Sequence, residues 1–142
     1  MGKLIERLLD ASRSGVYRSP RAEPIMDAVR GSALSLVMIR AQGKEALLTQ
    51  IAAELDFPDW FGQNWDALED CLTDLSWRNA AGHVLVFEEP QPEEPQPGDD
   101  LGVLIDVLHS VAEYWARRGE RFFAVFIDPP RALALPDLYV EK

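Results

Sequence analysis

The sequence contains a single cysteine, Cys71, and only two histidines among 142 residues. One cysteine excludes a disulfide within the chain and any metal site built from several thiolates. His83 and His109 stand in no pattern such as His-Glu-x-x-His, so we expect neither of them to be catalytic. A phosphate-binding loop is missing too, because Gly43-Lys44 has neither the preceding glycine nor the following Ser or Thr. No cofactor is therefore expected.

Long hydrophobic runs are also absent. No stretch approaches the ~18 consecutive apolar residues that a membrane span requires. The first ten residues, MGKLIERLLD, mix charged with apolar side chains, unlike a secretory signal. We therefore expect a cytoplasmic protein without a membrane partner.

Positive charge is scarce, with 14 Lys and Arg against 24 Asp and Glu and a formal net charge of −10. Such a surface repels nucleic acids and attracts basic proteins over long distances. We therefore expect no direct binding of nucleic acid, although the charge alone does not identify a basic partner. The length and the 47% content of hydrophobic residues fit one globular domain with its own core.

Short apolar runs alternate with amphipathic helical patterns along the chain. The apolar runs predict buried strands at residues 33–40, 83–87 and 122–127. Apolar residues at helical spacing predict helices at 44–55, at 65–76, and from a cap at Asp99 or Asp100 to Gly119. This β-α-α-β-α-β order predicts an α/β fold with a small three-stranded parallel sheet packed by helices.

The segments around this pattern carry weaker signals. Residues 1–32 are expected to form an N-terminal extension with a short helix at its start, an irregular connection, and one further helical turn near Ile25. The Pro- and Glu-rich residues 88–98 predict an extended linker inside a domain at 33–128. Residues 129–142 are expected to form a loosely packed tail. Nothing requires a dimer, so we expect a monomer when the chain is free.

The helix predicted at 65–76 has two unlike sides. At 100° per residue, one side is apolar and carries Trp65, Leu68, Cys71, Leu72 and Leu75. The other side is polar and carries Asp66, Glu69, Asp70, Thr73 and Asp74. Like charges four residues apart destabilise an isolated helix by roughly 0.2–0.5 kcal/mol per pair. The helix dipole offsets this only for Asp66 in the first turn, so folding gains little from the acidic side.

Two adjacent aromatics, Trp60 and Phe61, precede this helix, with Gly62 in the connection and Asn64 as a good N-cap. A core usually buries only one of two such neighbours, so we expect at least one at the surface. Carboxylates beside an exposed aromatic can take the places of phosphates and a base. The pattern thus indicates a mimic of nucleic acid, while an ordinary solvated helix face is the plain alternative.

Residues 55–73, LDFPDWFGQNWDALEDCLT, resemble the signature segment of the barstar family. The shared features are a proline, two aromatics, Gly, any residue, Asn, an apolar residue, and then D-A-L-x-D-C-L-T. The resemblance covers about residues 33–128 and implies that family's three-stranded parallel sheet. It also implies an inhibitor without enzymatic activity, whose partner is a basic ribonuclease or related toxin.

The resemblance also implies roles for individual residues. Asp70 matches the family's central inhibitory aspartate, which enters the ribonuclease active site where a substrate phosphate would lie, and Asp66 matches the second acidic contact. Trp60 matches an interface aromatic, and Gly62 and Asn64 match the turn and cap that aim the helix. The expected partner-binding set is completed by Phe61, Glu69, Thr73 and Asp74.

The chain departs from the family pattern at several of these positions. Glu69 stands where a tryptophan is usual, and Asp74-Leu75 replaces a Gly-Trp pair. The family's glutamate on the third helix falls on Tyr114, with Glu113 adjacent, and Arg117-Arg118 add positive charge nearby. These departures concern the identity of the partner more than the mode of binding.

Two other functions remain open from the sequence. An immunity or antitoxin protein on the same fold would block a different nuclease or toxin. A metal-assisted hydrolase would use Asp66 and Asp70 as a carboxylate pair. The second is disfavoured because adjacent residues on one exposed helix face lack a converging cavity. Cys71 lies on the apolar side and is expected to be a buried, inert thiol.

Overall fold

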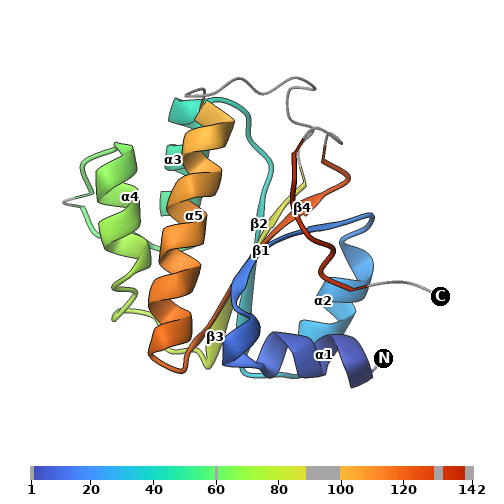
Figure 1. Cartoon of the computed structure of the whole chain (residues 1–142). Coiled ribbons are helices and arrows are strands. Elements are labelled where there is room, and N and C mark those ends of the chain that lie inside the picture. Colours follow the sequence, from blue (N-terminus) through green and yellow to red (C-terminus); the bar gives the residue numbers. More distant parts are fainter. Residues whose placement is uncertain (1, 60, 89–99, 130–132, 140–142) are drawn as a thin grey trace.

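Four parallel strands form one sheet in the order β1-β4-β3-β2 (Figure 1). The computed structural model describes residues 2–59, 61–88, 100–129 and 133–139. The strands are β1 (Gly15–Ser19), β2 (Leu34–Ile39), β3 (Gly82–Phe87) and β4 (Arg121–Ile127). The predicted α/β fold with a parallel sheet is confirmed, and the three predicted strands correspond to β2, β3 and β4.

The prediction of a three-stranded sheet is wrong, because β1 adds a fourth strand at one edge. This strand lies within the segment that the sequence predicts to be an irregular connection. It pairs with β4 from Gly15 opposite Phe123 to Ser19 opposite Ile127. An edge strand is less enclosed than a central one, and in β1 only Val16 and Ser19 are buried. The strand therefore lacks the continuous apolar run that reveals buried parallel strands in a sequence.

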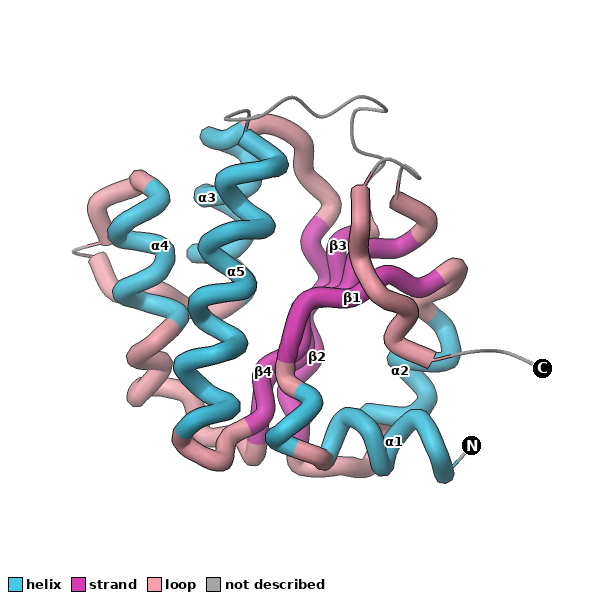
Figure 2. The backbone as a smooth tube through the Cα atoms, in the orientation of Figure 1, coloured by secondary structure: helices cyan, strands magenta, loops and turns pink. Residues whose placement is uncertain are grey.

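The direction of the chain places helices on both faces of the sheet (Figure 2). From β2 to β3 and from β3 to β4, the chain moves between adjacent strands through α3 (Lys44–Glu54), α4 (Trp65–Leu72) and α5 (Asp100–Arg117). From β1 to β2 it moves across the sheet in the opposite direction through α2 (Glu23–Val29). Since parallel crossovers are right-handed, α2 lies on the face opposite α3, α4 and α5. The N-terminal α1 (Gly2–Leu9) packs beside α2, and a 3-10 turn (Ala11–Arg13) leads into β1.

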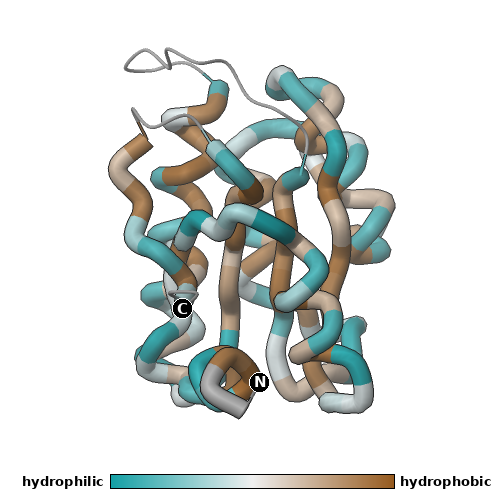
Figure 3. Tube along the Cα trace, turned by 90° about the vertical axis from the view of Figure 1, so that its right-hand side faces the viewer, coloured by the Kyte–Doolittle hydropathy of each residue, from teal (hydrophilic) through white to brown (hydrophobic). Residues whose placement is uncertain are grey.

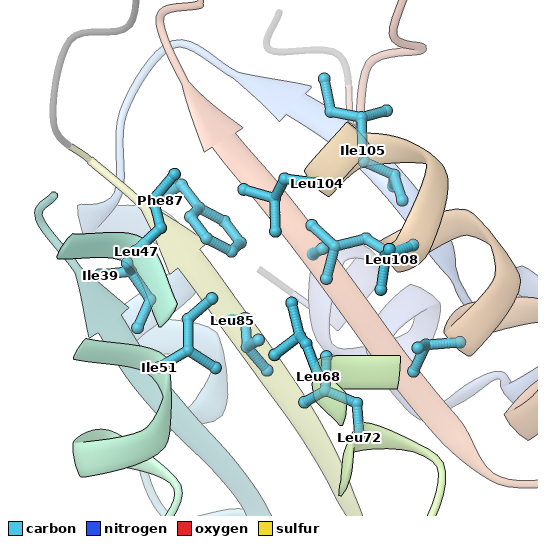
Figure 4. Packing of buried hydrophobic residues seen from close by; sticks show 14 of the residues in the cluster. Ile39, Leu47, Ile51, Leu68, Leu72, Leu85, Phe87, Leu104, Ile105 and Leu108 are labelled. Atoms are coloured by element: carbon cyan, nitrogen blue, oxygen red, sulfur yellow. The ribbon is translucent and has the colours of Figure 1, made fainter. Parts of the chain in front are cut away.

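Alternate strand residues fill two hydrophobic clusters, one on each face of the sheet. On the α5 face, Phe87 and Phe126 stack with ring centroids 4.6 Å apart. They belong to a cluster that residues of α3, α4 and α5 complete, among them Leu47, Leu68 and Leu104 (Figure 4). On the other face, Phe123 and its neighbours pack against Leu8 and Ile25 from α1 and α2. Figure 3 shows the hydrophobic residues of the strands in the middle of the molecule. Residues 1–32, predicted to be an extension, therefore contribute a strand and two helices to the sheet and its hydrophobic clusters.

The described part of the C-terminal tail packs more closely than predicted. Leu133, Leu135 and Leu138 are buried. The backbone N–H of Leu138 donates to the carbonyl of Arg18 at 3.0 Å, and Asp137 forms an isolated β-bridge with Arg18, so the tail lies along the outer edge of β1. Covering an edge strand in this way satisfies backbone groups that would otherwise be open to another chain. Residues 89–98 of the linker predicted at 88–98, and the proposed cap Asp99, lie outside the described residues.

No helix in the described ranges has the length and apolar character needed to cross a membrane.

The contribution of the N-terminal segment can be measured with two neighbouring residues of α2. Ile25 is 0% exposed, whereas Met26 is 39% exposed. We expect Ile25→Ala to lower the free energy of unfolding by about 2–5 kcal/mol, because it leaves a cavity against the sheet. Met26→Ala should change it by about 0.5 kcal/mol or less. Denaturant titration measures both values, and similar small effects of the two changes would contradict the description of α2 as part of the core.

Candidate protein-binding site

A tight turn directs the chain into α4. The N–H of Phe61 donates to the carbonyl of Pro58 at 3.0 Å, and Gln63 then adopts a left-handed backbone with φ of 58°. A Cβ atom on Gly62 would lie 3.3 Å from Nδ2 of Asn64, so the turn leaves little room for a side chain there. Asn64 is extended, and its side-chain oxygen accepts from the N–H of Ala67 at 2.7 Å. The predicted N-cap is confirmed.

The helix ends at Leu72, earlier than the predicted Ser76. The hydroxyl of Thr73 donates to the carbonyl of Glu69 at 2.8 Å and so closes the last turn. Leu75 then adopts a left-handed backbone with φ of 50°, which turns the chain out of the helical path. The side chain of Leu75 is only 3% exposed, so Leu75 packs in the core although it lies outside the helix. Asp74 consequently lies just beyond the acidic side of α4 rather than on it.

The two sides of α4 differ as the sequence predicts. Leu68, Cys71 and Leu72 are fully buried. Asp66, Glu69 and Asp70 are exposed. Within the described part of the chain, none of these three carboxylates forms an ion pair or accepts a hydrogen bond. Their capacity to accept hydrogen bonds is therefore available to another molecule.

Cys71 lies among the apolar residues of α4, as predicted. Burial raises the pKa of its thiol, and the charges of Asp70 and Asp74 raise the pKa further. Only the thiolate is strongly nucleophilic, so this environment makes Cys71 unreactive.

An aromatic cluster holds the turn before α4. Phe61 is half-buried and meets the ring of Phe57 edge-on, with centroids 5.0 Å apart. Phe57 in turn meets Trp77 edge-on at 6.0 Å, and the indole N–H of Trp77 donates to the carbonyl of Leu55 at 2.9 Å. Trp60, the other predicted interface aromatic, lies outside the described residues. The cluster connects the segments before and after α4, so the two ends of the helix are positioned together.

The C-terminal end of α4 is fixed to α5 by a hydrogen bond. The indole N–H of Trp115 donates to the carbonyl of Leu72 at 2.8 Å. Figure 4 shows Leu68 and Leu72 pointing into the cluster that also contains Leu85 and Leu108. No local sequence pattern reveals this contact, because the partner of Trp115 is a main-chain carbonyl on another helix. The acidic side of α4 is thus presented by a helix anchored at both ends.

The connection from α4 to β3 is held by Arg78. Its guanidinium donates to the hydroxyl of Ser35 at 2.8 Å and to the carboxylate of Asp56 at 3.0 Å. His83, at the start of β3, is buried nearby, and its Nδ1 has no hydrogen-bond partner among the residues that the structure describes. Burial, together with the positive charge of Arg78, lowers the pKa of His83 to about 4. His83 is therefore a neutral structural residue at pH 7.

A groove of about 490 Å³ runs beside the acidic side, between α4 and α5. Glu69 and Thr73 line it from α4, and the α5 side is lined by His109, Ser110, Glu113, Tyr114, Arg117 and Arg118. A larger hollow of about 810 Å³ lies near the start of α3 and contains none of the predicted site residues. Within the described ranges, no group of three His, Cys, Asp or Glu side chains is arranged to hold a metal ion.

Comparison with models of protein families gives a match over most of the chain. Residues 32–127 match the family model described as Barstar (barnase inhibitor), which covers well over half of the sequence. No curated protein sequence matches the chain. The matched range contains the turn at Gly62, the cap at Asn64 and the whole of α4.

The cap of α4 gives a direct test of how the helix is positioned. Asn64→Ala should lower the free energy of unfolding by about 1 kcal/mol, because the N–H of Ala67 loses its acceptor. Asn64→Ser keeps an acceptor and should cost less. Urea titration of the two variants measures the difference, and equal losses would show that the cap does not stabilise α4.

The burial of His83 predicts a pH dependence of stability. The unfolded chain takes up a proton on this residue near pH 6.5, whereas the folded chain does so only near pH 4. The contribution of His83 is complete above pH 6.5 and is lost as the pH falls towards 4. Comparing the unfolding free energies of the wild type and His83→Gln at pH 7 and 4.5 isolates this loss. We expect it to be on the order of 1–3 kcal/mol, and parallel pH profiles would contradict the assignment.

Proposed function

The chain belongs to the barstar family, and we propose that it inhibits a basic ribonuclease by placing the exposed side of α4 in that enzyme's active site. The observation that carries this proposal is the state of Asp66 and Asp70. Both carboxylates are exposed and lack partners within the described part of the chain, although they belong to a helix fixed at both ends. These carboxylates can therefore bind the cationic side chains of a partner protein.

The chemistry of a ribonuclease active site fits this surface. Such a site gathers Arg, Lys and His side chains to bind phosphate and to stabilise the charge of the reacting group. Carboxylates accept charge-assisted hydrogen bonds from the same side chains, with bidentate geometry in the case of Arg. Asp70, near the middle of the exposed side, is proposed to take the place of a substrate phosphate, with Asp66 one turn earlier as a second contact.

The rigidity of α4 increases the affinity that these contacts provide. Binding that orders flexible side chains or loops loses part of the interaction energy. Here the cap of Asn64 and the hydrogen bond from Trp115 position the helix before the partner arrives. No internal ion pair of Asp66 or Asp70 has to be broken within the described structure. The net charge of −10 also steers a basic partner towards the chain.

Inhibition by occupancy needs no chemistry from the chain itself. We propose that it is not an enzyme and uses no cofactor, since its acidic residues share one exposed helix face instead of converging in a cavity. Glu69, Thr73 and Asp74 are proposed to contact the partner around Asp70, and Phe61 to form part of the apolar boundary. Gly62 and Asn64 are proposed to position the helix. Trp60 is also proposed as a contact.

The target is proposed to be a ribonuclease, while an immunity function against another nuclease or toxin would use the same surface. Glu69 and Asp74 add negative charge beside Asp66 and Asp70, which fits an active site that is strongly basic. A panel of purified basic ribonucleases that includes barnase separates these targets. Inhibition of RNA cleavage by an equimolar amount of the chain is expected for at least one member. The chain is proposed to act as a monomer in the cytoplasm.

The role of Asp70 can be tested by removing its charge with little change of shape. For the ribonuclease that the chain inhibits, Asp70→Asn should weaken binding by about 2–5 kcal/mol. This is the general cost of removing one partner from a buried, hydrogen-bonded charge pair, and complexes of this family are among the examples from which that cost is known. This loss corresponds to a dissociation constant raised by roughly 30-fold or more. The matched control is Asp27→Asn, which removes one exposed carboxylate from α2 on the opposite face of the sheet.

Isothermal titration calorimetry gives both dissociation constants. The control should change affinity by less than about threefold, since only long-range attraction is altered. Equal affinities of the wild type and Asp70→Asn would exclude the proposed binding mode.

A further inference from the structure

The acidic side of α4 is bordered by positive charge at the end of α5. Arg117 and Arg118 line the same groove as Glu69 and Thr73, and α4 and α5 pack side by side (Figure 1). Neighbouring packed helices have axes about 8–10 Å apart, so both surfaces lie within reach of one partner. A partner that covers α4 therefore also meets this end of α5.

The two arginines differ in how their charges are used. Arg117 forms an ion pair with Glu113 at 2.8 Å, one turn earlier on α5. Arg118 lies over the ring of Tyr114, with its guanidinium carbon 3.6 Å from the ring centroid. Within the described residues, Arg118 has no carboxylate partner. Its charge is therefore not neutralised, and its guanidinium plane is supported by an aromatic face.

The support under Arg118 is connected to α4 itself. Tyr114 meets Trp115 edge-on, with ring centroids 5.2 Å apart. Trp115 donates its indole N–H to the carbonyl of Leu72 at the end of α4. Contacts through Tyr114 and Trp115 thus fix the position of Arg118 relative to the acidic residues. A positioned cation beside a positioned group of carboxylates forms a surface with two signs of charge.

Given the proposed function, we propose that Arg118 determines specificity by binding a carboxylate at the rim of the partner's active site. A partner whose rim is basic at this point would meet Arg118 with repulsion. A partner with an aspartate or glutamate there would form a charge-assisted pair, for which the planar guanidinium is well suited. The chain would then bind ribonucleases that carry a carboxylate beside the basic active site more tightly than ribonucleases that have only basic side chains there.

The same arginine also lies just after the last turn of α5, where a positive charge interacts favourably with the helix dipole. That effect concerns stability and needs no partner. Arg117, the last residue of α5, is also exposed to solvent, but its charge is offset by Glu113. Arg117→Ala is therefore a matched control for Arg118→Ala, and unfolding measurements on both variants show that each remains folded.

The experiment uses the full chain and barnase as the probe, with barnase variants that each carry one glutamate at an exposed position around the active-site mouth. Dissociation constants are measured for the wild type, Arg118→Ala and Arg117→Ala against every barnase variant. We expect at least one variant to bind the wild-type chain at least fivefold more tightly than unaltered barnase does. This gain should vanish with Arg118→Ala and persist with Arg117→Ala. Tyr114→Phe, which keeps the ring, should also preserve the gain.

Three results would overturn the inference. If no glutamate position shows a gain that depends on Arg118, while Asp70→Asn still weakens binding of unaltered barnase, the inference fails and the proposed function stands. If Arg117→Ala abolishes the gain as fully as Arg118→Ala, the effect is general attraction and not a specific contact. If unaltered barnase and all its variants fail to bind, the inference fails, and the same failure across the ribonuclease panel removes the proposed function as well.

Discussion

The proposed binding surface depends on the burial of one side of α4. Leu68, Cys71 and Leu72 are fully buried, and the two leucines belong to the cluster shared with the sheet and α5. Burying a leucine side chain contributes about 1.5–3 kcal/mol, which is large compared with the repulsion of a few tenths of a kcal/mol between neighbouring carboxylates. The apolar side therefore determines how the helix is oriented. Asp66, Glu69 and Asp70 point outward as a consequence, in an arrangement that an isolated helix would not favour.

The neighbouring helix α5 connects the core to this surface. Its apolar side packs against β4 and β1, while Trp115 holds the end of α4 through a hydrogen bond. Tyr114, the next residue along the chain, contacts Trp115 and supports Arg118. Residues that stabilise the fold and residues proposed to contact the partner are thus adjacent on one helix. A change in the core below Trp115 would be expected to alter the relative positions of the two charged groups.

The sequence predicts most of the local structure of the candidate site because that structure depends on neighbouring residues. The residues from Pro58 to Leu72 are contiguous, and helical periodicity separates their apolar and acidic positions without knowledge of the fold. Asn64 and Gly62 are recognisable for the same reason, since capping and turn formation depend on near neighbours. The end of the helix is less predictable. Leu75 continues the apolar pattern, yet it is buried from a left-handed backbone position beyond Thr73.

What the sequence does not predict depends on contacts between distant segments. β1 has no apolar run because it lies at the edge of the sheet, and its place beside β4 depends on pairing across more than a hundred residues. The hydrogen bond from Trp115 to Leu72 and the burial of Leu138 beside β1 are of the same kind. Such contacts leave little trace in local composition, because many different residues can satisfy a backbone carbonyl or cover a strand.

The proposed function requires α4 to occupy the active site of a ribonuclease. Competition between the chain and a nucleoside monophosphate for one purified basic ribonuclease tests this binding mode most directly. If α4 takes the place of a phosphate, the nucleotide and the chain exclude one another, and the apparent dissociation constant of the chain rises linearly with nucleotide concentration. A ternary complex in which both are bound, with the affinity of the chain unchanged, would contradict the account.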